Sequence, residues 1–128
     1  MKNHGVIHPD LVRLLAQLGH KDEVVICDAG FPIPLGVERI DLAYRLGSPE
    51  FGDVVETIAT DIAVESILVA DECADDLVEW LESATDAEST ERVTHDQLKD
   101  RAVRSRAVIR TGETTPYANV ILIAGVTF

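Results

Sequence analysis

Two side chains that could donate a proton or hold a ligand flank one short apolar segment. The stretch "LGHKDEVVICDAGFPIP" (residues 18–34) places His20 before the apolar run and Asp28 directly after it. An imidazole titrates near neutral pH and can act as a general acid, and a carboxylate can orient an imidazole or accept hydrogen bonds from hydroxyl groups. Both residues also have a structural interpretation, because His20 could cap a helix end and Asp28 could stabilise a turn.

His95 is a third candidate, since it begins a predicted helix directly after a predicted strand. It could face the same sheet edge as Asp28, although an exposed first-turn residue is the structural alternative. His20, Asp28 and His95 could in principle form a metal site of two histidines and one carboxylate, but no tight spacing supports one. The chain has no P-loop, G-x-S-x-G, C-x-x-C or G-x-G-x-x-G motif, so nothing indicates a nucleotide, flavin or zinc.

The segments that would position these residues alternate between strand and helix patterns. Apolar residues recur at helical spacing in four segments, which predicts helices over 9–18, from Ser48-Pro49 through about 58, over 72–84 and over about 95–105. Apolar runs predict strands at 23–27, 39–43, 62–70, 107–112 and 119–128, and a short strand in "ERVTH" (residues 91–95) leads into the last helix. Thr94 and Gln97 fit a capping box for the last helix. This alternation predicts a single α/β domain over residues 1–128, with a mostly parallel sheet.

Charge and composition limit the partners. The 23 acids against 11 Lys and Arg give a net charge of −12, and such a surface repels phosphate backbones and anionic lipid. We therefore expect no nucleic-acid and no membrane partner. The N-terminus has no apolar signal-peptide core, and the longest apolar run is far too short to span a membrane, which predicts a cytoplasmic protein. Cys27 and Cys73 make no disulfide framework, and Cys27 reads as a small buried apolar residue.

Three stretches together resemble a known family. "LGHKDEVVICDAGFPIP", "ERIDLA" and "AVIRTGETTPYANVILIAGVTF" resemble the D-ribose pyranase branch of the RbsD/FucU sugar mutarotases, and the match covers nearly the whole chain. The resemblance implies a three-layer α/β/α fold, no cofactor, and a homo-oligomer, typically a homodecamer of two pentameric rings with sites between neighbouring subunits. Phe31 stands where many members carry an aliphatic residue, which bears on fine substrate choice.

The resemblance also implies a role for each candidate residue. His20 matches the proton-donating catalytic histidine, and the fold is expected to bring it into one pocket with Asp28. The positions that match substrate-binding residues are Asp28, His95, Tyr117, Ala118 and Asn119. No residue matches a metal ligand.

The implied reaction interconverts the β-pyranose and β-furanose forms of D-ribose by general acid–base ring opening and reclosure. Three alternatives remain: an L-fucose mutarotase on the same fold, a ribose-binding module without catalysis, and a metal-dependent isomerase. The "DAGFPIP" and "YAN" stretches favour the ribose branch, and His20 beside them favours catalysis over binding alone.

Overall fold

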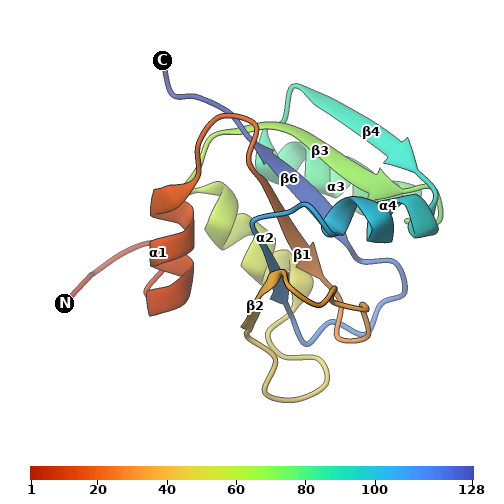
Figure 1. The fold of residues 1–128 in the computed structure, drawn as a ribbon, viewed down its shortest axis with the longest axis horizontal. Helices are drawn as coiled ribbons and strands as arrows, with labels where there is room; N and C mark the ends of the chain where they lie inside the picture. Colours follow the sequence, from red (N-terminus) through yellow and green to blue (C-terminus); the bar gives the residue numbers. More distant parts are fainter.

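The computed structural model describes all 128 residues, and its alternating strands and helices build one sheet with helices on both faces (Figure 1). The six strands are β1 (Glu23–Cys27), β2 (Glu38–Asp41), β3 (Val64–Ala70), β4 (Ser89–Val93), β5 (Ala107–Arg110) and β6 (Val120–Ala124). The four helices are α1 (Pro9–Gln17), α2 (Phe51–Ala59), α3 (Asp75–Thr85) and α4 (His95–Ala102). No helix has the length and apolar character needed to cross a membrane.

The strands lie in the order β2-β5-β1-β6-β3-β4. Neighbours β2 and β5, β5 and β1, and β3 and β4 are parallel. The last strand, β6, inserts between β1 and β3 and is antiparallel to both. The predicted mostly parallel α/β sheet is confirmed, with one reversed strand near its centre.

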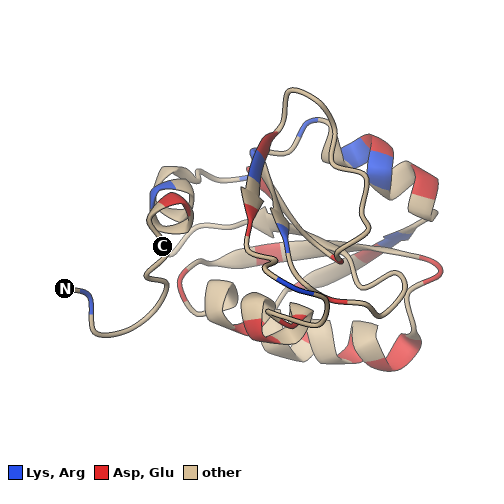
Figure 2. Ribbon diagram, turned by 90° about the horizontal axis from the view of Figure 1, so that it is seen from below, with Lys and Arg blue, Asp and Glu red and all other residues tan.

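Alternation along each strand divides the apolar core into two layers. In β1, Val24 and Ile26 face the larger layer, to which α1, α2 and α3 contribute, whereas Val25 and Cys27 face the smaller layer under α4. Figure 2 shows α2 and α3 on one side of the sheet and α4 on the other. Each large apolar side chain buried in this way contributes roughly 1.5–3 kcal/mol, so a sheet that is covered on both faces can have strands that are apolar throughout.

Cys27 is fully buried, as the sequence predicted. Burial, reinforced by the adjacent charge of Asp28, raises the pKa of its thiol to about 12. The thiol therefore stays protonated at neutral pH and packs as an apolar group.

Some element boundaries differ from the sequence prediction. Helix α3 begins at Asp75 rather than at residue 72, because the N–H of Cys73 donates to the carbonyl of Ala70 in a turn that buries the thiol. Helix α4 ends at Ala102, where the hydroxyl of Ser105 donates to the Ala102 carbonyl. The predicted capping box at the start of α4 is confirmed.

A buried acid joins the C-terminal end of α4 to the start of β1. Glu23 is 8% exposed and accepts hydrogen bonds from Arg101 at 2.6 Å and from Arg104 at 2.9 Å. Burial on its own raises the pKa of Glu23, but hydrogen bonds and charge from the two guanidinium groups outweigh it, so the pKa lies below its ordinary value.

We expect Glu23→Gln to lower the free energy of unfolding at neutral pH by about 1.5–3 kcal/mol, the range for hydrogen bonds to charged groups. Because the pKa of Glu23 is lowered on folding, its contribution is present above the unfolded pKa and is lost as pH falls through the folded value. Urea unfolding of both proteins at neutral pH and at about pH 3 should show the difference shrinking in acid. Glu38→Gln, which affects an exposed pair with Arg13, should change stability by no more than about 1 kcal/mol. A pH-independent deficit in Glu23→Gln would contradict the electrostatic explanation.

Candidate active site

Most of the candidate residues lie at one edge of the sheet. Asp28 follows the carboxyl end of β1, and His95 follows that of β4. The reversed direction of β6 starts this strand at the same edge, which brings Tyr117–Asn119 there as well. The expectation that Asp28 and His95 share an edge is therefore confirmed, and this is the edge where open α/β sheets bind ligands.

Asp28 and Asn119 form a reciprocal pair. The backbone N–H of Asp28 donates to Asn119 Oδ1 at 2.9 Å, and Asn119 Nδ2 donates to Asp28 Oδ2 at 3.0 Å. The N–H of Gly30 donates to Asp28 Oδ1 at 2.9 Å, so the turn-stabilising interpretation of Asp28 is also correct. A carboxylate has about four acceptor positions, and about two of them stay available for hydroxyl groups.

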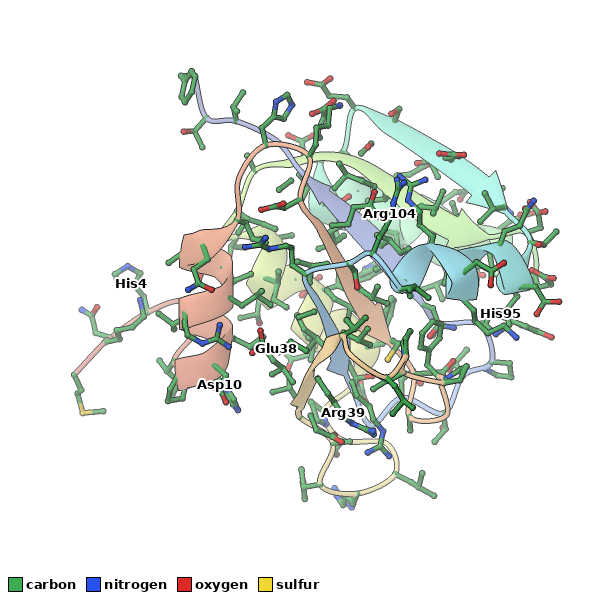
Figure 3. The ribbon with its side chains drawn as sticks, in the orientation of Figure 1. His4, Asp10, Glu38, Arg39, His95 and Arg104 are labelled. Carbon is green, nitrogen blue, oxygen red and sulfur yellow. The ribbon has the colours of Figure 1, made fainter.

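His95 lies at the first position of α4, with Arg104 beyond the other end of that helix (Figure 3). Its ring packs edge-on against Tyr117, with 5.2 Å between ring centroids, and against Phe31 at 6.1 Å. Its Nδ1 is buried and has no hydrogen-bond partner in the chain. An unpartnered buried nitrogen is costly, and a bound hydroxyl group could satisfy it. Phe31 therefore contacts a candidate binding residue directly.

The residues of the 117–119 segment differ in exposure. Tyr117 is 39% exposed and has a φ of 60°, in the left-handed region that few non-glycine residues adopt. Ala118 and Asn119 are 1% and 0% exposed. The side chain of Asn119 is directed at Asp28, so its contribution in this chain is to hold Asp28 in place.

Two residues that the sequence analysis did not identify hold this edge together. Glu113 accepts backbone hydrogen bonds from Thr114, Thr115 and the first residue of α2. Burial raises its pKa, but these N–H donors outweigh that effect and lower it. Arg110 donates to the carbonyl of Ala29 at 3.0 Å. The local pattern that could have predicted the role of Glu113 is an acid followed by two threonines in a predicted turn. No local pattern could have predicted the contact of Arg110 with Ala29, because the two residues are 81 positions apart in the chain.

His20 lies at the opposite edge of the sheet. It sits in a tight turn over 19–22, where the N–H of Gly19 donates to Asp22 Oδ2 and Lys21 has a φ of 70°. His20 Nε2 lies 2.7 Å from Glu65 Oε2. The side chain of His20 therefore contacts the start of β3 rather than the end of α1, and the helix-capping interpretation is wrong.

Within one chain, the fold does not bring His20 and Asp28 into a single pocket. The two residues lie beyond opposite ends of β1, whose five residues span roughly 16 Å. No group of three or more His, Cys, Asp or Glu side chains is close enough to hold a metal ion, so the set of His20, Asp28 and His95 is not assembled within the chain.

A hollow of about 760 Å³ adjoins His20. It is lined by the end of α1, the segment before β3 and the last residues of the chain, which include Gly125 and Phe128. The volume lies within the range of small-molecule sites. Val126 and Phe128 are 46% and 102% exposed beside it, which leaves apolar surface next to a candidate proton donor.

Known proteins share the sequence pattern and the fold of this chain. The RbsD / FucU transport protein family matches residues 1–127. The chain is 47% identical to proteins named D-ribose pyranase from Bacillus thuringiensis and Bacillus cereus, with 100% of both chains covered. The solved structure of Bacillus subtilis RbsD complexed with D-ribose matches with a TM-score of 0.93 at 43% identity and covers 100% of both chains. The fucose mutarotase of Streptococcus pneumoniae in complex with L-fucose has a TM-score of 0.74 at 23% identity over 95% of each chain, and so shares the fold.

Proposed function

We propose a function for this chain, which belongs to the RbsD / FucU transport protein family over residues 1–127. On this premise, the chain is a D-ribose pyranase, an isomerase of the cytoplasm. It interconverts the β-pyranose and β-furanose forms of D-ribose. The observation that carries the proposal is the full-length identity of 47% to D-ribose pyranases. The match to RbsD complexed with D-ribose supports the same sugar.

The reaction requires only proton transfers. A pyranose is a cyclic hemiacetal, and it opens when the ring oxygen gains a proton, the bond from that oxygen to the anomeric carbon breaks, and the anomeric hydroxyl loses its proton. The aldehyde then closes through a different hydroxyl group, which loses a proton while the carbonyl oxygen gains one. No electron is gained or lost by the sugar, so the proposed enzyme uses no redox cofactor. General acid–base catalysis accelerates such steps by about 10²–10⁴-fold.

The residues divide between two tasks. His20 donates the proton to the ring oxygen and takes one back on reclosure. Asp28, held by Asn119, accepts hydrogen bonds from sugar hydroxyl groups at the other sheet edge. His95 and Tyr117 flank that position through their ring contact. Ala118 is buried between Tyr117 and Asn119, and its backbone N–H donates to the carbonyl of Thr115 at 3.4 Å.

We further propose that each site is completed by two copies of the chain. Within one chain β1 separates His20 from Asp28, so the His20 edge of one copy must meet the Asp28 edge of its neighbour. The exposed Val126 and Phe128 beside His20 provide apolar surface for that contact. The proposed assembly is the homodecamer of two pentameric rings that the resemblance implies.

Saturation-transfer NMR on D-ribose tests the activity. The protein should accelerate exchange between the pyranose and furanose signals, equally with and without EDTA. L-Fucose serves as the comparison sugar. Absence of acceleration at any protein concentration would refute the proposal, and acceleration for L-fucose alone would assign the chain to the fucose branch.

Mixed assemblies test whether the site is shared. At ribose concentrations well below the dissociation constant of the wild-type protein, His20→Ala and Asp28→Ala should each lose most of the activity, the first through its rate and the second through its affinity. Co-expression of the two with different tags should restore part of that activity. Random mixing in a head-to-tail ring leaves about one quarter of the sites with both residues intact. Light scattering checks that the mixed assembly has the wild-type mass. If the mixture is as inactive as its components, the site does not combine these residues from two chains.

A further inference from the structure

We propose that Glu65 is a positioning residue for catalysis: it holds His20 through Nε2, so that Nδ1 exchanges the proton with the sugar. The inference rests on the proposed function, because it assigns a task within the ring-opening step.

The carboxylate of Glu65 lies between two groups of the 19–22 turn. Oε2 is 2.7 Å from His20 Nε2, and Oε1 accepts a hydrogen bond from Lys21 Nζ. The Glu65 side chain is 27% exposed and that of His20 is 50% exposed. The left-handed backbone at Lys21 thus allows consecutive side chains to reach one carboxylate 44 and 45 residues away.

The backbone around this carboxylate is fixed by β6. The N–H of Lys21 donates to the carbonyl of Ala124 at 2.8 Å, and the N–H of Gly125 donates to the carbonyl of Ala63 at 2.9 Å. A Cβ on Gly125 would lie 3.3 Å from both Cβ and the backbone N of Glu65, so glycine permits this close approach. The turn that carries His20 and the strand that carries Glu65 are therefore held against the same segment.

This contact determines which ring nitrogen carries the exchanging proton. A carboxylate accepts but cannot donate when ionised, so it fixes a hydrogen on Nε2 and defines the tautomer of the neutral ring. His20 Nδ1 has no hydrogen-bond partner in the chain. Hydrogen bonds from Lys21 and then from His20 lower the pKa of Glu65, which keeps this residue an acceptor throughout the cycle.

The proton balance of the step is then complete. The imidazolium carries hydrogens on both nitrogens, and Nδ1 gives its proton to the ring oxygen as the bond to the anomeric carbon breaks. The anomeric hydroxyl releases its proton to water. The neutral ring that remains has its hydrogen on Nε2, facing Glu65. On reclosure Nδ1 recovers a proton from the hydroxyl group that closes the new ring, and the carbonyl oxygen takes a proton from water to become the new anomeric hydroxyl.

The test compares Glu65→Ala with Glu65→Gln, which keeps an acceptor oxygen. We expect Glu65→Ala to lower kcat about 10- to 100-fold, the range for partners that orient a reactive histidine, with KM changed less than about 2-fold because no sugar contact is lost. Glu65→Gln should recover part of kcat. Glu38→Ala, which removes a carboxylate paired with Arg13, is the matched control and should behave as wild type.

The second readout does not depend on turnover. In ¹⁵N-labelled protein at high pH, the His20 ring should carry its hydrogen on Nε2 in wild type and in Glu38→Ala, and show mixed tautomers in Glu65→Ala. If Glu65→Ala keeps both the wild-type tautomer of His20 and the wild-type kcat, the inference is overturned. If Glu65→Ala does not fold, Glu65→Gln decides: a wild-type kcat together with a hydrogen on His20 Nδ1 in that variant would overturn the inference. A wild-type protein that fails to accelerate ribose exchange refutes the proposed function instead, and the tautomer measurement still decides whether Glu65 orients the ring.

Discussion

His20→Ala will lower the rate of ribose ring exchange about 10²–10⁴-fold, the range attributed to a general acid–base group, while ribose affinity changes less than about 2-fold. Proton donation matters in the transition state and little in the ground state, so the loss falls on the rate. The half-exposed ring can be removed without leaving a core cavity. Exchange NMR gives the rate, and titration calorimetry gives the affinity.

The control for His20→Ala is His4→Ala. His4 is also exposed, and its ring forms a hydrogen bond with the neighbouring Asn3. This variant should keep both rate and affinity. Near-normal exchange in His20→Ala would show that another group donates the proton. His95 would be the next candidate, because its ring lies at the sheet edge that carries Asp28.

Asp28→Ala will weaken ribose binding about 10- to 100-fold, since loss of a charge-assisted hydrogen bond costs roughly 1.5–3 kcal/mol. The free acceptor positions of Asp28 engage hydroxyl groups already in the ground state, so affinity falls before the rate does. Asn119→Ala should weaken binding less, because it removes the side chain that orients Asp28 rather than Asp28 itself. Titration calorimetry on both variants measures the order.

Asp10→Ala is the matched control for charge, since Asp10 is exposed in the first turn of α1. It should bind ribose as wild type does. Wild-type affinity in Asp28→Ala would mean that Asp28 only stabilises the turn, through the hydrogen bond from the N–H of Gly30, and does not bind ribose.

Elements that depend on local pattern could be predicted from the sequence. The leucine stripe of α1, the apolar run of β1 and the capping box at Thr94 each follow from neighbouring residues, and the structure has all three. The shared edge of Asp28 and His95 followed from the rule for parallel strands. The insertion of β6 between β1 and β3 could not be predicted, because strand order depends on pairings between segments far apart in the chain.

The same limit applies to the site. The pairs Asp28 with Asn119 and His20 with Glu65 join residues 91 and 45 positions apart, and no periodicity in the sequence encodes such contacts. The sequence placed His20 and Asp28 at opposite ends of one strand, but the resemblance supplied the expectation of one pocket. Because a strand is extended, residues beyond its two ends are far apart, and within one chain His20 and Asp28 are therefore separated by the length of β1.

The location of His20 and Asp28 at opposite ends of β1 affects the stoichiometry of the proposed enzyme. If each site joins the His20 edge of one copy to the Asp28 edge of another, the contact is head-to-tail. Such contacts either close into rings or continue as open filaments. An open filament leaves the His20 edge of one terminal copy and the Asp28 edge of the other unpaired, so it has one complete site fewer than it has chains. A closed ring has as many sites as chains, and a separated chain has none. Specific activity should therefore fall on dilution as rings dissociate, before any individual chain unfolds.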